Sequence, residues 1–217
     1  MNRRISDSAV RRLSLYLRFL RELRRQGVEL VSSRELADRT GATSAQVRKD
    51  LSLFGSFGKR GRGYAVAALA DTLEKILGLG RSWRVCVVGV GKIGTALLGY
   101  RDLARRGFDV VAAFDVEPAK VGRTVFDVPV FPFDEVDRVV RDRRVEIAII
   151  TTPPEAAQEV ASRLARAGVG AILNFAPVEL AASAALTVRT MDVVLELEGL
   201  SYVLASDARE GEDGEGE

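Results

Sequence analysis

The glycines at residues 89–94 have the spacing of a phosphate-binding turn. The segment reads Gly-Val-Gly-Lys-Ile-Gly and follows an apolar run, as the pattern Gly-x-Gly-x-x-Gly requires. The first glycine permits a tight turn, the second lets the backbone approach a pyrophosphate, and the third lets a helix pack closely on a strand. That helix would add backbone N–H groups and a partial positive charge. The predicted phosphate-binding residues are Gly89, Val90, Gly91, Lys92, Ile93 and Gly94.

A carboxylate stands where such a turn needs a partner for a ribose. Asp115 ends the next apolar run, 21 residues after Gly94. A carboxylate at this place can accept hydrogen bonds from the ribose hydroxyls of NAD(H) and would repel the 2′-phosphate of NADP(H). Val116 follows it, and no arginine occurs before Arg123. We therefore predict NADH or NAD+ as the ligand, with Asp115 and Val116 in the site. A glycine turn without a cofactor and a site for a different dinucleotide are the alternatives.

The turns after two later apolar runs would complete the pocket. Thr152 and Pro153 follow one run, and Asn174 and Phe175 stand at the end of the next. In an open α/β sheet the ligand lies beyond the carboxyl ends of the strands. We expect Thr152 and Asn174 to hydrogen-bond the nicotinamide half, and Pro153 and Phe175 to form its wall. Ordinary turn chemistry is the competing explanation for these residues.

A second group of polar and basic residues occupies positions 43–64, TSAQVRKDLSLFGSFGKRGRGY. A helix, a short turn at Gly41 and a second helix make a helix-turn-helix pattern. Thr43 and Gln46 fit a capping box at the start of that second helix, and the glycine-rich end favours a two-stranded wing. The predicted DNA-binding residues are Ser44, Gln46, Arg48, Lys49, Ser52, Lys59, Arg60 and Arg62. A small helical bundle with a flexible basic loop is the alternative.

The remaining chain must position these two groups. Apolar periodicity predicts helices near 7–26, from Ser32 or Ser33, 43–54 and 65–80. Beyond them, strands are expected near 84–89, 109–114, 128–131, 145–151, 170–174 and 187–191, and helices near 92–105, 118–123, 134–142, 155–167 and 193–205. Near-continuous apolar strands indicate a parallel sheet covered on both faces. We predict an α/β protein with a winged-helix domain at 1–80, a Rossmann doubly wound parallel-sheet domain at 81–192, a helix at 193–206 and a disordered acidic tail at 207–217.

Composition narrows the possible functions. Residues 1–63 hold 15 Lys and Arg against 6 Asp and Glu, a formal charge of +9, whereas the whole chain carries only +2. Such asymmetry favours a polyanionic partner, double-stranded DNA, although a solvated basic face would look the same. The single cysteine, Cys86, excludes an intramolecular disulfide and a cysteine-rich zinc site. No apolar run is long enough to span a bilayer, and we expect a cytoplasmic protein.

Together these residues resemble one family, the Rex redox-sensing transcriptional repressors. The resemblance covers residues 8–205 and rests on SAQVRKDLSLFGSFGKRGRGY, VVGVGKIGTAL, FDVEPAKVGR and ILNFAPV, in this order. It implies a homodimer that binds palindromic operator DNA when NADH is scarce and releases the DNA when NADH accumulates. It also implies that the helix at 193–205 is swapped between subunits. That segment is apolar on too many sides to sit exposed.

The resemblance further implies a regulatory network of Arg18, Tyr100 and Asp192, with Asp192 also near the coenzyme. Unrelated surface contacts are the alternative for these three residues. The acidic tail and Val193 depart from the usual family pattern. The rival class is an NAD-dependent oxidoreductase with an N-terminal accessory domain. A chain without histidine lacks the commonest general acid and base, and no substrate domain follows the Rossmann unit. We therefore predict no catalytic residues and no enzyme activity.

Overall fold

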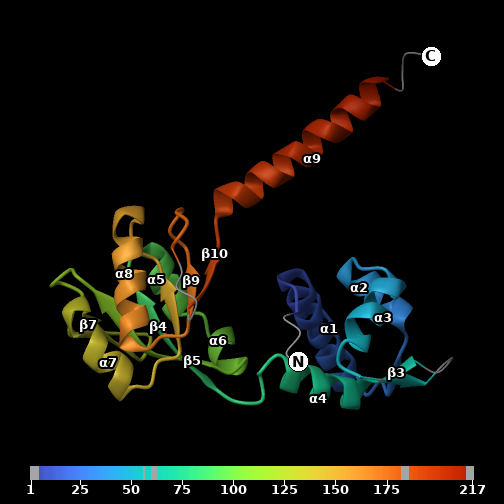
Figure 1. The fold of residues 1–217 in the computed structure, drawn as a ribbon, viewed down its shortest axis with the longest axis horizontal. Helices are drawn as coiled ribbons and strands as arrows, with labels where there is room; N and C mark the ends of the chain where they lie inside the picture. The colour runs from blue at the N-terminus through green and yellow to red at the C-terminus, as the bar shows by residue number, and fades with distance from the viewer. Residues whose placement is uncertain (1–4, 56, 60–62, 182–185, 214–217) are drawn as a thin grey trace. The chain divides into compact units, whose positions relative to one another are not determined.

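The computed structural model describes residues 5–55, 57–59, 63–181 and 186–213. The chain divides into two compact units, Met1–Arg81 and Ser82–Glu217, and Figure 1 shows their elements. The division falls one residue after the boundary expected from the sequence. Each unit has its own apolar core, so each is described by itself.

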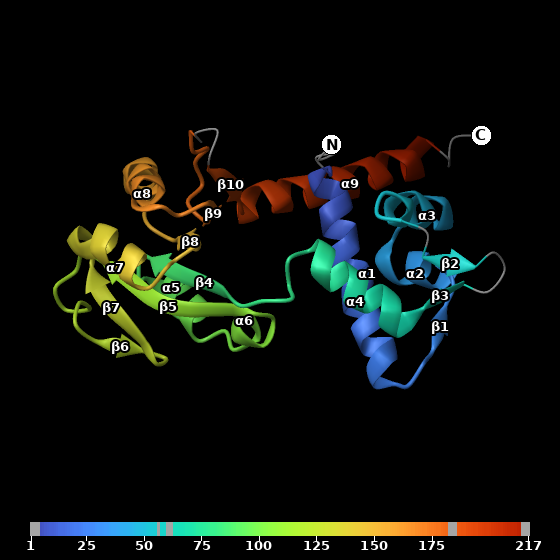
Figure 2. The same ribbon diagram turned by 60° about the horizontal axis from the view of Figure 1, so that its bottom comes forward.

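The N-terminal unit is a small α/β domain. Its elements in order are α1 (Asp7–Arg25), β1 (Leu30–Val31), α2 (Ser33–Thr40), α3 (Ser44–Ser52), β2 (Gly58–Lys59), β3 (Gly63–Ala65) and α4 (Val66–Ile76). Helix α1 packs against α4 (Figure 2), and the helices bury Leu13, Tyr16, Leu36, Val47 and Leu69 among others. This apolar core fixes α3 relative to α1.

The turn between α2 and α3 follows the expected chemistry with one exception. Gly41 adopts φ +67°, which glycine tolerates without strain, and Ser32 and Glu35 form a capping box at the start of α2. At α3, Thr43 accepts a hydrogen bond from the Gln46 amide. The capping box predicted there is incomplete, because the Gln46 side chain bonds the Asp50 carboxylate four residues on. Helix α3 also ends at Ser52 rather than at residue 54.

The wing is a three-stranded antiparallel sheet in the order β1-β3-β2. The sequence predicted the hairpin of β2 and β3 but not β1, which pairs Leu30 with Ala65. Gly63 has φ +77°, and a Cβ there would lie 2.5 Å from the Val31 carbonyl oxygen. Glycine is therefore required where β3 meets β1. Arg60 and Arg62 lie outside the described residues.

The C-terminal unit is a Rossmann-type sheet in the order β10-β9-β8-β4-β5-β7-β6. Its strands are β4 (Trp83–Val88), β5 (Phe108–Asp115), β6 (Thr124–Val125), β7 (Val128–Pro132), β8 (Ile147–Ile150), β9 (Ala171–Asn174) and β10 (Thr187–Thr190). All adjacent pairs are parallel except β6 with β7. The chain builds outward from β4 in one direction through β5 and then in the other through β8. This reversal places a crevice at the carboxyl ends of these strands.

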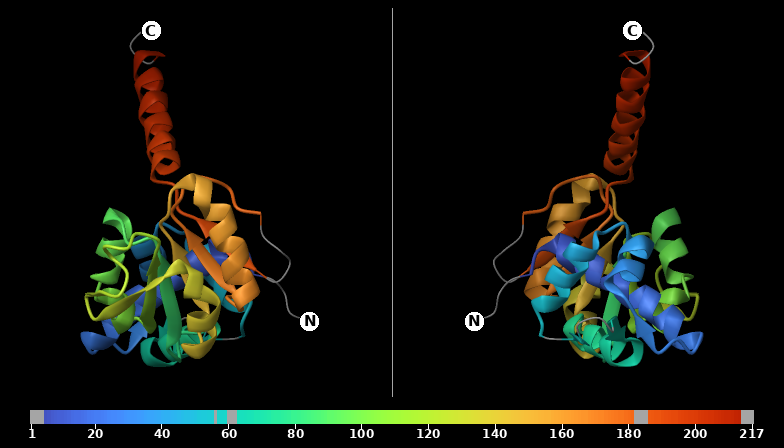
Figure 3. Two further views of the ribbon diagram at one scale, coloured as in Figure 1. Left: turned by 90° about the vertical axis from the view of Figure 1, so that its left-hand side faces the viewer. Right: turned by 90° about the vertical axis from the view of Figure 1, so that its right-hand side faces the viewer.

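Helices cover both faces of this sheet, and Figure 3 shows α8 lying on one of them. One face packs on α7 (Val136–Asp142), which the 3₁₀ helix η1 (Phe133–Glu135) precedes, and on α8 (Pro154–Ala167). The opposite face packs on α5 (Lys92–Leu98), with α6 (Asp102–Arg105) next along the chain. Alternate residues of β4 enter opposite cores, Cys86 on the α8 side and Val87 on the α5 side.

Two sequence predictions in this unit are wrong. The helix expected over 92–105 breaks into α5 and α6, because glycine is a weak helix former and the Phe126 ring lies against Gly99, 3.0 Å from where a Cβ would stand. The helix expected over 118–123 is a series of turns. The few residues between Pro118 and Gly122 are too short a segment for a helix. Gly122 also has φ +79°, which is not a helical conformation.

Helix α9 (Val193–Asp213) follows β10. It continues as far as residue 213, into the stretch at 207–217 that was predicted to be a disordered acidic tail, and residues 214–217 lie outside the described part of the chain. Its apolar side chains are exposed, including Leu195, Leu197, Leu200 and Leu204 at 58 to 71%. Within the described residues, no helix is both long and apolar enough to cross a bilayer.

Candidate functional site

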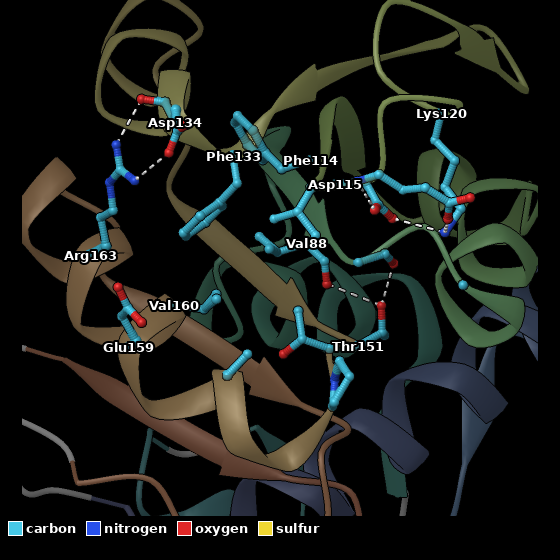
Figure 4. Close-up of a pocket in the computed structure, with 17 residues that line it drawn as sticks. Val88, Phe114, Asp115, Lys120, Phe133, Asp134, Thr151, Glu159, Val160 and Arg163 are labelled. Atoms are coloured by element: carbon cyan, nitrogen blue, oxygen red, sulfur yellow. Dashed lines mark hydrogen bonds and ion pairs between the residues drawn. The ribbon is translucent and has the colours of Figure 1, made fainter.

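A cavity of about 670 Å³ opens at the carboxyl ends of β4, β5 and β8. Figure 4 shows its floor at Val88, its carboxylate Asp115 and the α8 side chains that border it. The glycine turn, the end of β5, the start of η1 and the first turns of α8 supply the lining. The lining residues that the sequence predicted are Gly89, Gly91, Asp115, Val116, Thr152 and Pro153.

The three glycines of the turn have different roles. Gly89 has φ +95°, and a Cβ there would lie 2.9 Å from the Thr151 carbonyl oxygen. At Gly94 a Cβ would stand 1.9 Å from the Gly89 carbonyl oxygen, because α5 packs directly on the turn. At Gly91 no protein atom lies within 4 Å of that position, and Gly91 borders the cavity. Two glycines therefore let the protein pack, and one leaves space for a ligand.

Asp115 is 8% exposed at the end of β5. Its Oδ2 accepts a hydrogen bond from the Val90 amide at 2.7 Å, and its Oδ1 accepts one from the Glu117 amide at 2.9 Å. Burial alone would raise the pKa of this carboxyl, but the two amides and Lys120 outweigh burial and lower it. The carboxylate is therefore ionised, and it braces the glycine turn as well as facing the cavity.

Lys120 is a cavity residue that the sequence analysis missed. Its ammonium lies 3.4 Å from Asp115 Oδ2 and 2.6 Å from Glu117 Oε2. The lysine is thus matched by two carboxylates, so this end of the cavity keeps a net negative charge. The i, i+3 spacing of Glu117 and Lys120 was visible in the sequence. Because a helix was wrongly expected at 118–123, the sequence did not show that the Lys120 side chain lies at the cavity.

Thr151 and Thr152 differ in how they are satisfied. Thr151 Oγ1 donates to the Gly89 carbonyl at 2.6 Å and so ties β8 to the turn (Figure 4). Thr152 Oγ1 is buried and has no hydrogen-bond partner in the described part of the chain. Because buried polar groups are normally hydrogen-bonded, an orphan at the edge of a cavity indicates a position that a ligand completes.

The far wall combines an aromatic ring with a cation. Phe133 lines the cavity, and the Arg163 guanidinium lies 5.1 Å from the centre of its ring. Arg163 also donates to the Asp134 carbonyl at 2.7 Å (Figure 4). It donates as well to Asp137 at 3.1 Å. These contacts fix η1 against α8. The sequence offered no signal for this wall, because its residues come from two elements far apart in the chain.

Several predicted coenzyme residues do not line the cavity: Val90, Lys92, Ile93, Gly94, Asn174, Phe175 and Asp192. Asn174 is fully buried, and its side-chain amide bonds the Ala176 amide and the carbonyls of Ala176 and Val178. Asparagine commonly bonds nearby backbone in this way. The contact of Asn174 with the coenzyme stays a prediction. Phe175 packs against the core on the α5 side.

The predicted regulatory residues fall in different units. Arg18 is exposed on α1, and Tyr100 is 56% exposed between α5 and α6. Asp192 caps α9, since its Oδ1 accepts hydrogen bonds from the amides of Val194 and Leu195. The three residues lie in different parts of the structure, and the network that would join them stays a prediction.

In the N-terminal unit, α3 presents the predicted DNA-binding side chains. Arg48, Lys49 and Ser52 are exposed, whereas Ser44 and Gln46 are half-buried. Arg48 donates to the Ser33 hydroxyl at 3.2 Å, and Lys59 lies in β2. Asp50 is only 2% exposed, which the sequence analysis did not anticipate for a charged residue of this helix.

Known proteins match both units. Family models described as a CoA binding domain and as a putative DNA-binding protein N-terminus match residues 81–178 and 4–52. A redox-sensing transcriptional repressor Rex from Carboxydothermus hydrogenoformans is 46% identical over 94% of this chain and 98% of its own length. This chain belongs to the Rex family. A Rex from a Roseiflexus species is also 46% identical, over 93% of this chain and 91% of its own.

Solved Rex-family structures share the whole architecture. The Rex-family repressor RSP in complex with NAD+ and operator DNA has a TM-score of 0.89 at 34% identity, over 98% of this chain and 99% of its own. RSP in complex with NADH has a TM-score of 0.86 at 33% identity, over 96% and 98%. Membership of the Rex family decides against the dehydrogenase alternative, because these relatives are repressors.

Proposed function

We propose that this chain represses transcription by binding a palindromic operator and leaves the operator when NADH binds its Rossmann unit. The observation that carries the proposal is the near full-length likeness to a repressor solved both with operator DNA and with NADH. The basic N-terminal unit supplies the DNA reader, and the glycine-lined cavity supplies the sensor. Its place of action is the cytoplasm.

The cavity fits a dinucleotide on the chain's own residues. Gly91 leaves open space where a pyrophosphate would approach, and the start of α5 offers backbone N–H groups. Asp115 and Val116 would hold the adenine ribose, and Thr152 Oγ1 would gain the partner it lacks. The paired carboxylates around Lys120 disfavour a 2′-phosphate, which supports NAD(H) over NADP(H).

Discrimination between NADH and NAD+ would come from desolvation. Oxidised nicotinamide is cationic and reduced nicotinamide is neutral, so an apolar wall penalises the oxidised form. Pro153, which lines the cavity, would belong to that wall. Phe175 and Val193 stay predicted members of it, although neither lines the cavity and Phe175 packs against the core on the α5 side. A cysteine switch does not fit this chain, because its one cysteine, Cys86, is fully buried and burial raises the pKa of its thiol to about 12. The redox signal would therefore be the coenzyme itself.

DNA binding would use α3 in a major groove, with the wing on the backbone. Ser44, Gln46, Arg48, Lys49 and Ser52 would contact bases or phosphates. Lys59, Arg60 and Arg62 would contact phosphates and make the affinity steeply dependent on salt.

A homodimer would place two such helices on the two half-sites of a palindrome. The exposed apolar side chains of α9 support a swapped helix, since burial in a partner would remove them from water. NADH must favour the arrangement that does not fit DNA, because a ligand with equal affinity for both states shifts neither. Arg18, Tyr100 and Asp192 would link the two units, and an Asp192→Ala protein with a normal NADH response would remove that link.

The test is a gel-shift assay on a palindrome from the region upstream of the chain's own gene. Titration with NADH should release the DNA at far lower concentration than NAD+ or NADPH. A complex that forms but ignores NADH, or the absence of any complex at low salt, would contradict the proposal. Cys86→Ala is a control that should respond to NADH like the unaltered protein.

A further inference from the structure

A buried polar cluster outside the cavity surrounds Asp50 of α3. Its Oδ2 accepts hydrogen bonds from Arg12 Nε at 2.7 Å and from the Tyr16 hydroxyl at 3.0 Å. Its Oδ1 accepts hydrogen bonds from Arg12 Nη2 at 2.8 Å and from Gln46 Nε2 at 2.7 Å. Arg12 and Tyr16 belong to α1, so one carboxylate joins α1 to the recognition helix.

The carboxylate has no remaining capacity. Two ionised oxygens offer about four acceptor sites, and four donors occupy them. Burial would raise the pKa of Asp50, but the hydrogen bonds from Arg12, Gln46 and Tyr16 lower it below the ordinary value. Asp50 is therefore an acceptor only.

An acceptor-only partner fixes the orientation of the Gln46 amide. The Gln46 oxygen cannot face Asp50, because two acceptors would oppose each other; the NH₂ group must face it. This leaves the amide oxygen and the second N–H of Gln46 for other partners. Gln46 is half-buried at the third residue of α3, and the first residues of a recognition helix are those that reach base edges.

We propose that Asp50 is a positioning residue that holds the Gln46 amide as a fixed donor and acceptor pair for reading adenine in each operator half-site. An amide reads adenine by accepting from N6 and donating to N7, which are the two functions that Asp50 leaves outward. Arg12 and Tyr16 support the orientation indirectly, since they hold the carboxylate. The inference rests on the proposed DNA-binding function and names the base that this function would select.

The experiment uses the full-length protein and a palindromic duplex that it selects from random sequence. Each half-site position is replaced symmetrically by the other base pairs, and affinity is measured by fluorescence anisotropy for four variants. Unaltered protein should prefer adenine at one position by roughly tenfold to a hundredfold, and Gln46→Ala should lose that preference. Asp50→Asn should reduce it as well, because an Asn amide lets Gln46 turn over.

A purely structural role for Asp50 predicts a different pattern. It would lower affinity for every duplex alike, including non-specific DNA. If Asp50 acts through Gln46, Asp50→Asn added to Gln46→Ala should cause no further loss of base preference, and non-specific affinity should hold or rise as a negative charge is removed. Glu74→Gln is the matched control. It also removes a carboxylate paired with α1, through Arg21 at 2.9 Å, and should keep the adenine preference.

The outcomes separate this inference from the proposed function. A uniform loss for Asp50→Asn, or an adenine preference that survives Gln46→Ala, overturns the inference and leaves the repressor function standing. Selection of no palindrome at all by the unaltered protein overturns both. If Asp50→Asn does not fold, the comparison of unaltered protein with Gln46→Ala still decides whether the Gln46 amide reads adenine.

Discussion

At the scale of single residues, we expect Asp115 to decide which coenzyme the cavity accepts. Its carboxylate is buried, ionised and paired with the Lys120 ammonium. We expect Asp115→Asn to weaken NADH binding by about 1.5–3 kcal/mol, the range for hydrogen bonds to a charged group, and to narrow the preference over NADPH. Asp109→Asn, at the exposed opposite end of β5, should change neither affinity. Calorimetric titration measures the Kd of each coenzyme. An unchanged ratio of the NADPH Kd to the NADH Kd in Asp115→Asn would argue against the role of Asp115.

Tyr16 gives a prediction about pH. Burial, and then Asp50, raise its pKa from 10.0 to about 12. Because the folded pKa is raised, the stability that the neutral phenol contributes is complete below pH 10 and is lost as the pH rises through about 12. Absorbance titration of unaltered protein minus Tyr16→Phe should show one phenol ionising near pH 12. A difference curve centred at pH 10 would mean that Tyr16 is not buried beside Asp50.

At the level of single residues, the sequence predicted the main ligand-binding motif but not every residue that lines the cavity. The glycine turn and Asp115 could be predicted, because their spacing is fixed by local backbone geometry. Lys120, Phe133 and Arg163 could not, since the wall that they form depends on how η1 and α8 pack. The type and position of Asn174 suit a ligand contact and a backbone contact equally well, and the structure shows the backbone contacts.

At the scale of elements, α5 packs directly on the turn that follows β4. This packing crowds Gly94 but leaves Gly91 of the same motif open. We expect Gly94→Ala to destabilise the unit by about 1–3 kcal/mol, the usual range for overpacking, because its Cβ would meet the Gly89 carbonyl at 1.9 Å. Gly91→Ala should leave stability unchanged and lose coenzyme affinity. Thermal unfolding with and without NADH measures both variants. Equal stabilisation of Gly91→Ala and unaltered protein by NADH would show that the ligand does not approach Gly91.

Element positions followed well from periodicity where apolar spacing was strong, as in α1, α8 and the central strands. They failed where glycine, proline or a distant side chain intervened. Gly99 with Phe126 breaks α5 from α6, and Pro118 with Gly122 prevents a helix. The short strand β1 was missed because two residues carry no periodic signal.

At the scale of the whole molecule, α9 predicts the oligomeric state. Its leucines are exposed along the described helix, and burial of each apolar side chain in a partner would contribute about 1.5–3 kcal/mol. We expect Leu200→Asp with Leu204→Asp to give monomers by analytical ultracentrifugation and to weaken operator binding. Glu198→Gln, on the same helix, should remain a dimer. A dimer that persists with both aspartates would show that α9 does not hold the subunits together.

The central claim is that NADH and operator DNA oppose each other through the dimer. Linkage requires that operator DNA weaken NADH binding by the same factor by which NADH weakens DNA binding. The direct measurement is the Kd of NADH, by nicotinamide fluorescence, with and without saturating operator at one salt concentration. The account predicts a Kd raised several-fold or more by operator and unchanged by a scrambled duplex. An identical Kd in all three conditions would contradict it.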